Sequence, residues 1–388
     1  MGGQMDVAII GIGIHPFGRF DDLSALDMGV TAARQALSDA GVAWSDVEFA
    51  VGGSLGSTQG TSAAPDAMVS RLGLTGVPFV NVSNGCATAG TALSMACTSI
   101  RAGVHDLGLV VGFDKHPRGA FDPDPALMGL GKWYGDTGMM LTTQFFAMKL
   151  QRYMHDFGIS RDTLARIAAK AYRNAARNPN AWRRKPWSED EILASRMLNE
   201  PLTQYMLCSP AEGGAAVVVC RADLARKFTE HPVFVKAVSM RTRKFGSFEV
   251  MAPWMPPERA DGPAVQAAQA CFEEAGIERG DVDVIQVQDS EPGAELMHLA
   301  ECGFCADGEQ EELVARGATE IHGPMPVNTD GGLIANGEPI GASGLRQIYE
   351  VCLQLRGEAG ERQVAAPRVG FTQVYGAPGV SACTILTR

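Results

Sequence analysis

QALSDAGVAWSDVE, residues 35–48, recurs in outline as ACFEEAGIERGDVD, residues 270–283. Each stretch has the pattern of a helix end, an Ala-Gly stop, a short turn and an Asp-Val pair that leads into a strand. The offset between the stretches is constant, because Gly41 corresponds to Gly276 and Asp46 to Asp281. A pattern that returns at a fixed offset indicates that the chain contains two copies of one βαβ-type unit.

The sequence around the first copy predicts alternating strands and helices. Residues 6–13 (DVAIIGIG) are short, β-branched and closed by glycine, as in a buried strand. Ser24 and Asp27 form a capping pattern for a helix that Gly41 ends. Further strands are expected at 47–51, 79–82 and 107–113, with a helix between the last two. Helices that alternate with buried strands predict an α/β fold whose mixed or parallel sheet is covered on both faces.

Between the two halves, from about 114 to 231, the pattern changes to helices, Pro-rich turns and a basic stripe. The stripe has helical spacing and consists of Arg166, Lys170, Arg173 and Arg177, with Arg183, Arg184 and Lys185 soon after. Such a cluster in an acidic chain is typical of a site that meets phosphates. A solvated helix face explains the same spacing. We therefore expect an inserted lobe that flanks a ligand or is simply solvent-exposed.

Composition excludes several classes of function. The chain has 388 residues and a net charge of −11, which argues against nucleic-acid binding. It has no run of eighteen apolar residues to span a membrane, and its opening lacks the features of a signal peptide. Nine scattered cysteines predict a reducing cytoplasm and no disulfide framework. The one CxxC pair, Cys302 and Cys305, has no second ligand pair, so no metal site is predicted.

Cys86 is the strongest single candidate for chemistry. It lies in NGCATAG, residues 84–90, between a predicted strand and a predicted helix. A thiol at a helix N-terminus is expected to have a lowered pKa, which favours the nucleophilic thiolate. The preceding glycine permits a sharp turn, and the small residues that follow leave room for a substrate. The competing interpretation is a free cysteine buried in the core.

Four blocks together resemble the thiolase superfamily, and within it the sterol-carrier-protein-type and lipid-transfer thiolase-like proteins. They are residues 81–88 (NVSNGCAT), 208–216 (CSPAEGGAA), 328–344 (NTDGGLIANGEPIGASG) and 355–360 (LRGEAG). The resemblance implies two duplicated βαβαβαββ halves in a layered α/β/α/β/α core, with a loop domain inserted in the first half. The boundaries expected are 1–235, with the insert at about 114–210, and 236–388. A homodimer is usual in this family.

Three departures from the family pattern bear on the chemistry. Family members place histidines where this chain has Gln288 and Glu338, and a histidine or second cysteine where it has Gln373. None of the seven histidines matches these positions, so only Cys86 of the usual set remains. Glutamine donates N–H bonds but carries no proton between groups. A glutamate works as an acid–base group if burial raises its pKa. Tyr375 is a further candidate acid–base residue.

The resemblance implies that coenzyme A is a substrate, with no permanently bound cofactor. We expect Cys86, Glu338 and Gln373 to converge on one pocket, with Gln288 at its wall. Phosphate contacts are assigned to Arg173, Arg177, Arg183 and Arg184, and Gly379 to the same coenzyme site.

Three functions remain open at this point. The first is an acyltransferase of thiolase type that acts on a carbon–carbon bond beside a thioester, with Cys86 as nucleophile. The second is a retro-aldolase of a steroid or lipid β-hydroxyacyl-CoA that works with a zinc-ribbon/OB-fold partner. The third is a non-catalytic acyl-CoA or lipid-binding protein.

Overall fold

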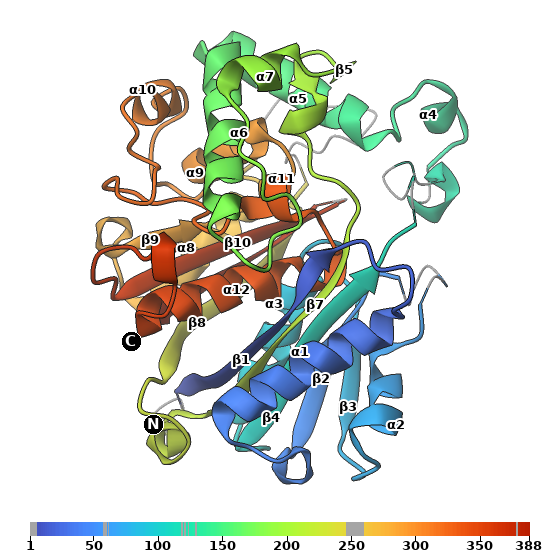
Figure 1. Ribbon diagram of the computed structural model, residues 1–388, viewed down its shortest axis with the longest axis vertical. Helices are drawn as coiled ribbons and strands as arrows, with labels where there is room; N and C mark the ends of the chain where they lie inside the picture. Colours follow the sequence, from blue (N-terminus) through green and yellow to red (C-terminus); the bar gives the residue numbers. More distant parts are fainter. Residues whose placement is uncertain are drawn as a thin grey trace.

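Strands from both halves of the chain meet in one sheet of nine strands (Figure 1). The computed structural model describes residues 6–56, 60, 62–117, 119, 122, 124–128, 130–245, 260–377 and 379–388. The elements before the inserted segment are β1 (Val7–Gly18), α1 (Ala25–Ala40), β2 (Phe49–Gly53), α2 (Val69–Leu72), β3 (Phe79–Val82), α3 (Thr88–Arg101) and β4 (Leu107–Lys115).

The inserted segment is mostly helical and leads back into the sheet. Its elements are α4 (Trp133–Asp136), α5 (Thr142–Phe157), α6 (Arg161–Ala176), α7 (Glu189–Ala194), β5 (Met197–Asn199) and β6 (Leu202–Thr203), followed by β7 (Glu212–Arg221). The remaining elements are β8 (Val233–Thr242), α8 (Pro263–Ala275), β9 (Val284–Gln286), α9 (Pro292–Glu301), α10 (Gln310–Ala315), α11 (Gly332–Asn336), α12 (Ile340–Arg356), β10 (Val369–Gly376) and β11 (Val380–Thr387).

The order of the strands shows the duplication directly. The sheet runs β3-β2-β4-β7-β1-β8-β11-β10-β9, and β1 pairs with β8 at its centre. On both sides of that pair the pattern of parallel and antiparallel neighbours is the same, since β2 lies parallel to β4 and β9 parallel to β10. A bridge between Ile285 and Val327 extends the second half by a counterpart of β3. The prediction of two equivalent halves is confirmed.

The local signals that marked the repeat act as expected. Ser24 caps α1 in a capping box with Asp27, and Gly41 ends it at a positive φ of 64°. In the second half Gly276 ends α8 at a φ of 63°. A short 3-10 turn follows each glycine, at Trp44–Asp46 and at Arg279–Asp281, and leads into the next strand.

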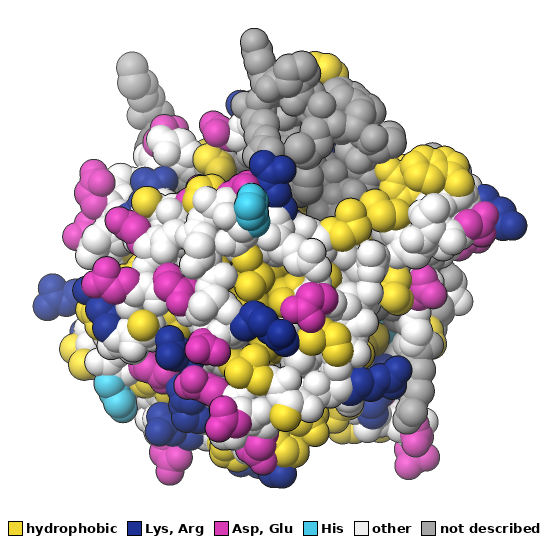
Figure 2. Space-filling model, turned by 90° about the horizontal axis from the view of Figure 1, so that it is seen from above, with side chains coloured by type: hydrophobic (Ala, Val, Ile, Leu, Met, Phe, Trp, Pro, Cys, Tyr) yellow, Lys and Arg dark blue, Asp and Glu magenta, His cyan; other side chains and the backbone are white. Residues whose placement is uncertain are grey.

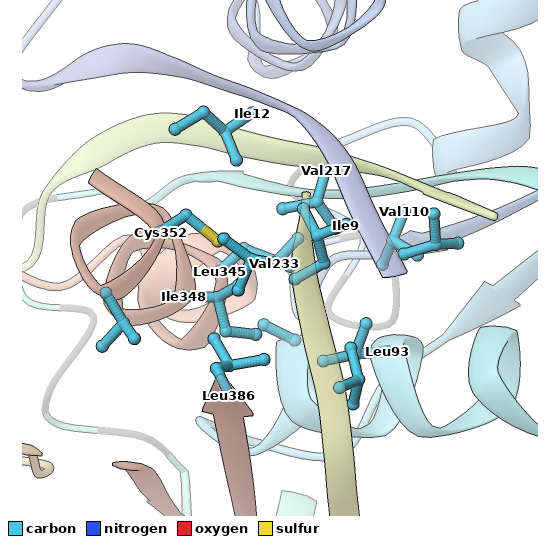
Figure 3. Packing of buried hydrophobic residues seen from close by; sticks show 14 of the residues in the cluster. Ile9, Ile12, Leu93, Val110, Val217, Val233, Leu345, Ile348, Cys352 and Leu386 are labelled. Carbon is cyan, nitrogen blue, oxygen red and sulfur yellow. The ribbon is translucent and has the colours of Figure 1, made fainter. Parts of the chain in front are cut away.

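The hydrophobic clusters connect five layers: α1, the strands of the first half, the central helices α3 and α12, the strands of the second half, and α8 with α9. The central cluster joins α3 and α12 to strands of both halves, with Leu93, Leu345 and Ile348 against Ile9 and Val233 (Figure 3). A second cluster packs α1 on the outer face of β1, β4 and β7, and a third packs α8 and α9 on β8, β10 and β11. The predicted α/β/α/β/α layering is confirmed. The exact domain boundaries at 235 and 236 remain a prediction.

The inserted segment packs around α6 in a hydrophobic cluster that also includes residues of α9, α10 and α11, at the upper end of the molecule in Figure 1. On the face seen from above, acidic and basic side chains lie interspersed with hydrophobic ones (Figure 2). Within the part of the chain that the structure describes, no helix combines the length and the apolarity that a membrane span requires.

Candidate active site

Cys86 lies on the tight turn that joins β3 to α3, as its sequence predicts. Gly85 has a positive φ of 55°, and Thr88 closes the turn by donating to the Gly85 carbonyl over 2.6 Å. The turn is pressed against the end of β10, because a Cβ atom at Gly376 would lie 2.9 Å from the Cys86 nitrogen. Cys86 remains partly exposed.

The electrostatics of Cys86 differ from the expectation. Burial, and after it the carboxylate of Glu338, raises the pKa of the Cys86 thiol well above its ordinary value. The prediction that the helix N-terminus lowers this pKa is wrong. Desolvation and a nearby negative charge both favour the neutral thiol.

Glu338 lies where the two halves of the site meet. Its backbone is bonded to the segment before β7, since its N–H donates to the Ser209 carbonyl over 2.9 Å. Its side chain is only 4% exposed. One carboxylate oxygen accepts from Gln288 Nε2 at 2.7 Å, and the other lies 3.6 Å from the Sγ atom of Cys208. The carboxylate is therefore in contact with Gln288 and with the Cys208 thiol.

Gln288 and Gln373 form the wall behind this carboxylate. The backbone N–H of Gln288 donates to Gln373 Oε1 at 3.1 Å, which fixes the loop after β9 to β10. The amide nitrogen of Gln373 donates to Ser381 Oγ at 3.3 Å. Gln373 thus supports Gln288 from behind. The structure brings Glu338 against Gln288 and Gln288 against Gln373, whereas the convergence of these residues with Cys86 on one pocket, and their catalytic roles, remain predictions.

Tyr375 points toward a different set of neighbours. It lies at the end of β10, one residue from Gly376, and is partly exposed. Its ring lies 5.7 Å from that of His298, and Lys149 Nζ lies 5.8 Å from its centroid.

Two residues of the site escaped the sequence reasoning. Cys208 is 2% exposed, and burial together with the charge of Glu338 raises the pKa of its thiol well above the ordinary value. Its only signal in the sequence was its place at the start of the second family block, residues 208–216. Asp114 is the penultimate residue of β4 and accepts from the Ser54 hydroxyl at 2.7 Å and from the Gly341 N–H at 2.6 Å. Asp114 thereby joins the first half to Gly341, which lies in the first turn of α12 and three residues after Glu338.

Asp114 also has a buried histidine beside it. His116 Nε2 lies 3.5 Å from Asp114 Oδ2. Burial alone would raise the pKa of Asp114, but the interactions with His116 and the hydrogen bonds from Ser54 and the Gly56 N–H lower it below the ordinary value. The carboxylate is therefore ionised at neutral pH and holds the loops of both halves.

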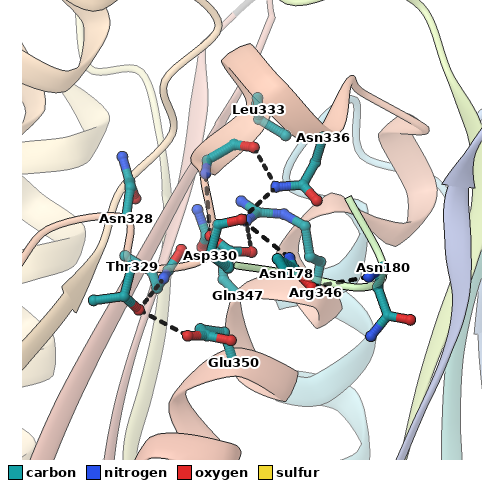
Figure 4. Close-up of polar contacts among 12 residues, drawn as sticks. Asn178, Asn180, Asn328, Thr329, Asp330, Leu333, Asn336, Arg346, Gln347 and Glu350 are labelled. Atoms are coloured by element: carbon teal, nitrogen blue, oxygen red, sulfur yellow. Dashed lines mark hydrogen bonds and ion pairs between the residues drawn. The ribbon is translucent and has the colours of Figure 1, made fainter. Parts of the chain in front are cut away.

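A buried polar network fixes the segment that carries Glu338 (Figure 4). Asp330 forms an ion pair with Arg346 of α12, and its carbonyl accepts from Asn178 at 3.0 Å and from Asn336 at 3.1 Å. Asn336 ends α11, and Gly337 then turns the chain at a φ of 77°. Because these groups bond to one another, the position of Glu338 is set by the fold.

The cations assigned to coenzyme phosphates have other partners within the chain. Arg173 pairs with Glu320 at 2.6 Å. Arg183 points inward and donates to the carbonyls of Ile334 and Leu207 and to the Ser209 hydroxyl. These contacts do not exclude a coenzyme phosphate, so the assignment of Arg173 and Arg183 stays a prediction.

The other positions assigned to the coenzyme keep that assignment as a prediction. The Arg177 carbonyl accepts from Arg362 at 3.0 Å, and the Arg177 and Arg184 residues are exposed. Gly379 packs on Arg243, because a Cβ atom at this glycine would lie 2.3 Å from Arg243 Cγ. No group of three His, Cys, Asp or Glu side chains suited to a metal ion occurs among the described residues.

Comparison with known proteins gives the family. The thiolase N-terminal domain matches residues 7–192, and a thiolase C-terminal domain-like model matches residues 255–388. The acetyl-CoA acetyltransferase of Methanothermobacter thermautotrophicus is 33% identical over 99% of this chain and 100% of its own length. Sterol carrier protein 2 of Oryctolagus cuniculus is 32% identical over 98% of this chain and 71% of its own length.

A solved structure of an Ltp2-ChsH2(DUF35) aldolase has the same fold. It superposes with a TM-score of 0.83 over 98% of both chains, at 24% identity.

Proposed function

This chain belongs to the thiolase family and is an enzyme of that superfamily, and we propose that it acts on the carbon–carbon bond beside the thioester of an acyl-coenzyme A. Aldol-type cleavage of a β-hydroxyacyl-CoA is the reaction that the site supports best. The observation that carries this proposal is the contact of the Glu338 carboxylate with Gln288 Nε2 at 2.7 Å, beside a Cys86 thiol whose pKa is raised.

Glu338 supplies the acid–base chemistry in this mechanism. Its carboxylate takes the proton of the substrate β-hydroxyl as the Cα–Cβ bond breaks. The electron pair of that bond moves to the thioester as an enolate, and the β-carbon becomes an aldehyde or ketone. Glu338 then returns the proton to Cα, which gives a shortened acyl-CoA. The proton balance closes without an external acid.

Gln288 orients the base and stabilises the enolate. One N–H of its amide group is bonded to Glu338 Oε1. An amide nitrogen has a second N–H, which can donate to the enolate oxygen. Neither step needs an imidazole, which explains how the site works with Gln288, Glu338 and Gln373 in place of histidine or cysteine.

Acyl transfer through Cys86 is the second candidate function. It is favoured by the partial exposure of Cys86 on its turn and by the relative named acetyl-CoA acetyltransferase. The raised pKa of the thiol disfavours it, because the thiolate is the attacking species. Binding without catalysis is the weakest of the three functions, since the chain is an enzyme of this superfamily.

One experiment separates these functions. The protein is incubated with a panel of β-hydroxyacyl-CoAs and β-ketoacyl-CoAs, and products and intact protein mass are measured. Cleavage to a carbonyl compound and a shortened acyl-CoA is expected, with loss in Glu338→Gln and retention in Glu274→Gln, whose side chain pairs with Arg101 on the surface. A covalent acyl adduct that disappears in Cys86→Ala, without aldol products, would replace this mechanism by acyl transfer.

A homodimer through the free edge of the sheet is part of the proposal. β3 is the last strand on its side of the sheet, and Val80 on it is 46% exposed. Met95 of α3 is exposed to the same extent. Edge strands with apolar side chains are templates for pairing with another chain. Light scattering should give a dimer that Val80→Lys weakens, and a monomer at micromolar concentration would contradict this assignment.

A small zinc-ribbon/OB-fold partner is a further part of the proposal. Its support is that the aldolase of the same fold is named for two components, Ltp2 and ChsH2(DUF35). If cleavage by the isolated chain is slow, co-expression with such a protein is expected to raise it.

A further inference from the structure

The loop after β1 brings Arg19 to the segment that pairs with Glu338. Gly18, the last residue of β1, is paired with Glu212, the first residue of β7. Because the two strands are antiparallel, the chain after Gly18 runs beside the chain that precedes Glu212. Arg19 Nη2 donates to the Pro210 carbonyl over 2.6 Å, and Arg19 Nη1 lies 3.2 Å from Glu212 Oε1. The ion pair with Glu212 therefore helps to aim the guanidinium at Pro210.

Pro210 and Glu338 form a single parallel bridge. The Glu338 N–H donates to the Ser209 carbonyl over 2.9 Å, and the Ala211 N–H donates to the Glu338 carbonyl over 3.4 Å. The N–H and the carbonyl of a trans peptide point in opposite directions, so the Pro210 carbonyl faces away from Glu338. Arg19 binds this outward carbonyl. A charged donor on the outer side thus supports a bridge that has only two hydrogen bonds, one of them long, on its inner side.

Arg19 also contacts the second connection between the first half and the Glu338 segment. Its Nη1 donates to the carbonyl of His116, two residues after Asp114. Asp114 in turn accepts from the N–H of Gly341, three residues after Glu338, at 2.6 Å. One guanidinium therefore joins the segment that pairs with Glu338 to the segment that holds the start of α12. Its planar fork fixes the two carbonyls relative to each other.

We propose that Arg19 is a positioning residue of the active site, which sets the place of the Glu338 carboxylate through the backbone. This role rests on the proposed function, in which Glu338 is the base. A displacement of a catalytic group by about 1 Å costs about 100-fold in rate. Substrate binding depends on other residues, so loss of Arg19 should lower kcat and leave KM nearly unchanged.

Steady-state kinetics of three variants test this role. Arg19→Ala should lower kcat for cleavage of a β-hydroxyacyl-CoA by about 100-fold, with KM within about twofold of the wild-type value. Arg19→Lys keeps the charge beside Glu212 but replaces two donor nitrogens by one, so we expect a loss of about 10-fold. Arg221→Ala is the matched control, because Arg221 lies at the other end of β7, is similarly exposed, and pairs with Asp106 and Asp223. It should keep the wild-type kcat.

Added guanidinium ions distinguish a positioning role from a general loss of stability. The Arg19 side chain is 25% exposed, so a small cation can enter the space that Arg19→Ala leaves. At millimolar concentrations guanidinium should raise kcat of Arg19→Ala by about 10-fold, as for one charged hydrogen bond regained, and should leave wild type and Arg221→Ala unchanged. A kcat that stays low at every such concentration would overturn the proposal, because a merely destabilised protein is not repaired by this ion.

Hydrogen exchange separates the role of Arg19 from the proposed reaction. The Glu338 and Ala211 N–H groups should exchange about 10-fold faster in Arg19→Ala than in wild type, measured by mass spectrometry of the peptides that contain them, and Arg221→Ala should leave them unchanged. If Arg19→Ala does not fold, as judged by circular dichroism, Arg19→Lys is used for both kinetics and exchange.

The two failures give different results. If the wild-type protein cleaves no β-hydroxyacyl-CoA, the proposed function is refuted, and the exchange rates alone decide whether Arg19 holds the Glu338 segment. If the wild-type protein is active and Arg19→Ala keeps its kcat, or if exchange at Glu338 is unchanged, Arg19 has no positioning role.

Discussion

The unfolding free energy of Glu291→Gln minus that of the wild-type protein should be larger at pH 8 than at pH 4.5. Glu291 is fully buried at the start of α9, and its pKa is raised to about 7 from the value of 4.5 for a free side chain. The folded protein therefore binds this proton more tightly than the unfolded chain does. The stability that the protonated group contributes is present below pH 4.5 and is lost as the pH rises through 7.

The size of the effect follows from the shift. One pKa unit corresponds to about 1.4 kcal/mol. The rise in the pKa of Glu291 from 4.5 to about 7 therefore corresponds to about 3 kcal/mol of unfolding free energy, which the wild-type protein loses as the pH rises past 7. Glutamine has nearly the same shape and no charge to ionise. The difference in unfolding free energy between Glu291→Gln and wild type should therefore rise by about 3 kcal/mol from pH 4.5 to pH 8.

Urea unfolding at several pH values, followed by circular dichroism, measures this difference. Glu274→Gln serves as the control, because its carboxylate is on the surface and should show a small change with pH. Lys149, whose charge lowers the pKa of Glu291, is the same in both proteins, so its contribution largely cancels. A difference that stays flat, or that falls as the pH rises, would refute the assignment of Glu291 as a carboxyl that resists ionisation.

Three further outcomes are expected. Lys170 and Glu295 form a buried ion pair of 2.5 Å. Lys170→Met should lower the unfolding free energy by about 3–5 kcal/mol, because it leaves the buried Glu295 carboxylate without its cation. A decrease below about 1 kcal/mol in thermal or urea unfolding would contradict this. Arg184→Glu should weaken coenzyme A binding in calorimetry, by less at high salt, and unchanged affinity would remove Arg184 from the coenzyme site. Thiolysis of acetoacetyl-CoA should be slow, with traces restored in Glu338→His, whereas wild-type turnover near ~10 per second would refute the role given to the missing histidines.

The sequence alone predicted the architecture of two equivalent α/β halves. The recurrence of 35–48 in 270–283 predicted the two halves, and the caps at Ser24 and Gly41 placed helix ends within a residue. These signals are local, since a cap or a glycine turn depends on neighbours a few residues away. That Gln288 and Glu338 belong to the same site as Cys86 was also predicted, because Cys86 and Glu338 lie in family blocks and Gln288 stands where family members place a histidine.

The charge state and the partners of the site required the tertiary structure. Asp114 and Gly341 are 227 positions apart in the chain, and Cys208 and Glu338 are 130 apart. No local pattern records such contacts. The pKa of Cys86 is raised because the fold buries it beside Glu338, and Arg183 points inward because carbonyls of α11 lie there. Desolvation and Coulomb interactions act through space, so residue identities fix which groups can titrate, while only their packing decides in which direction each pKa moves.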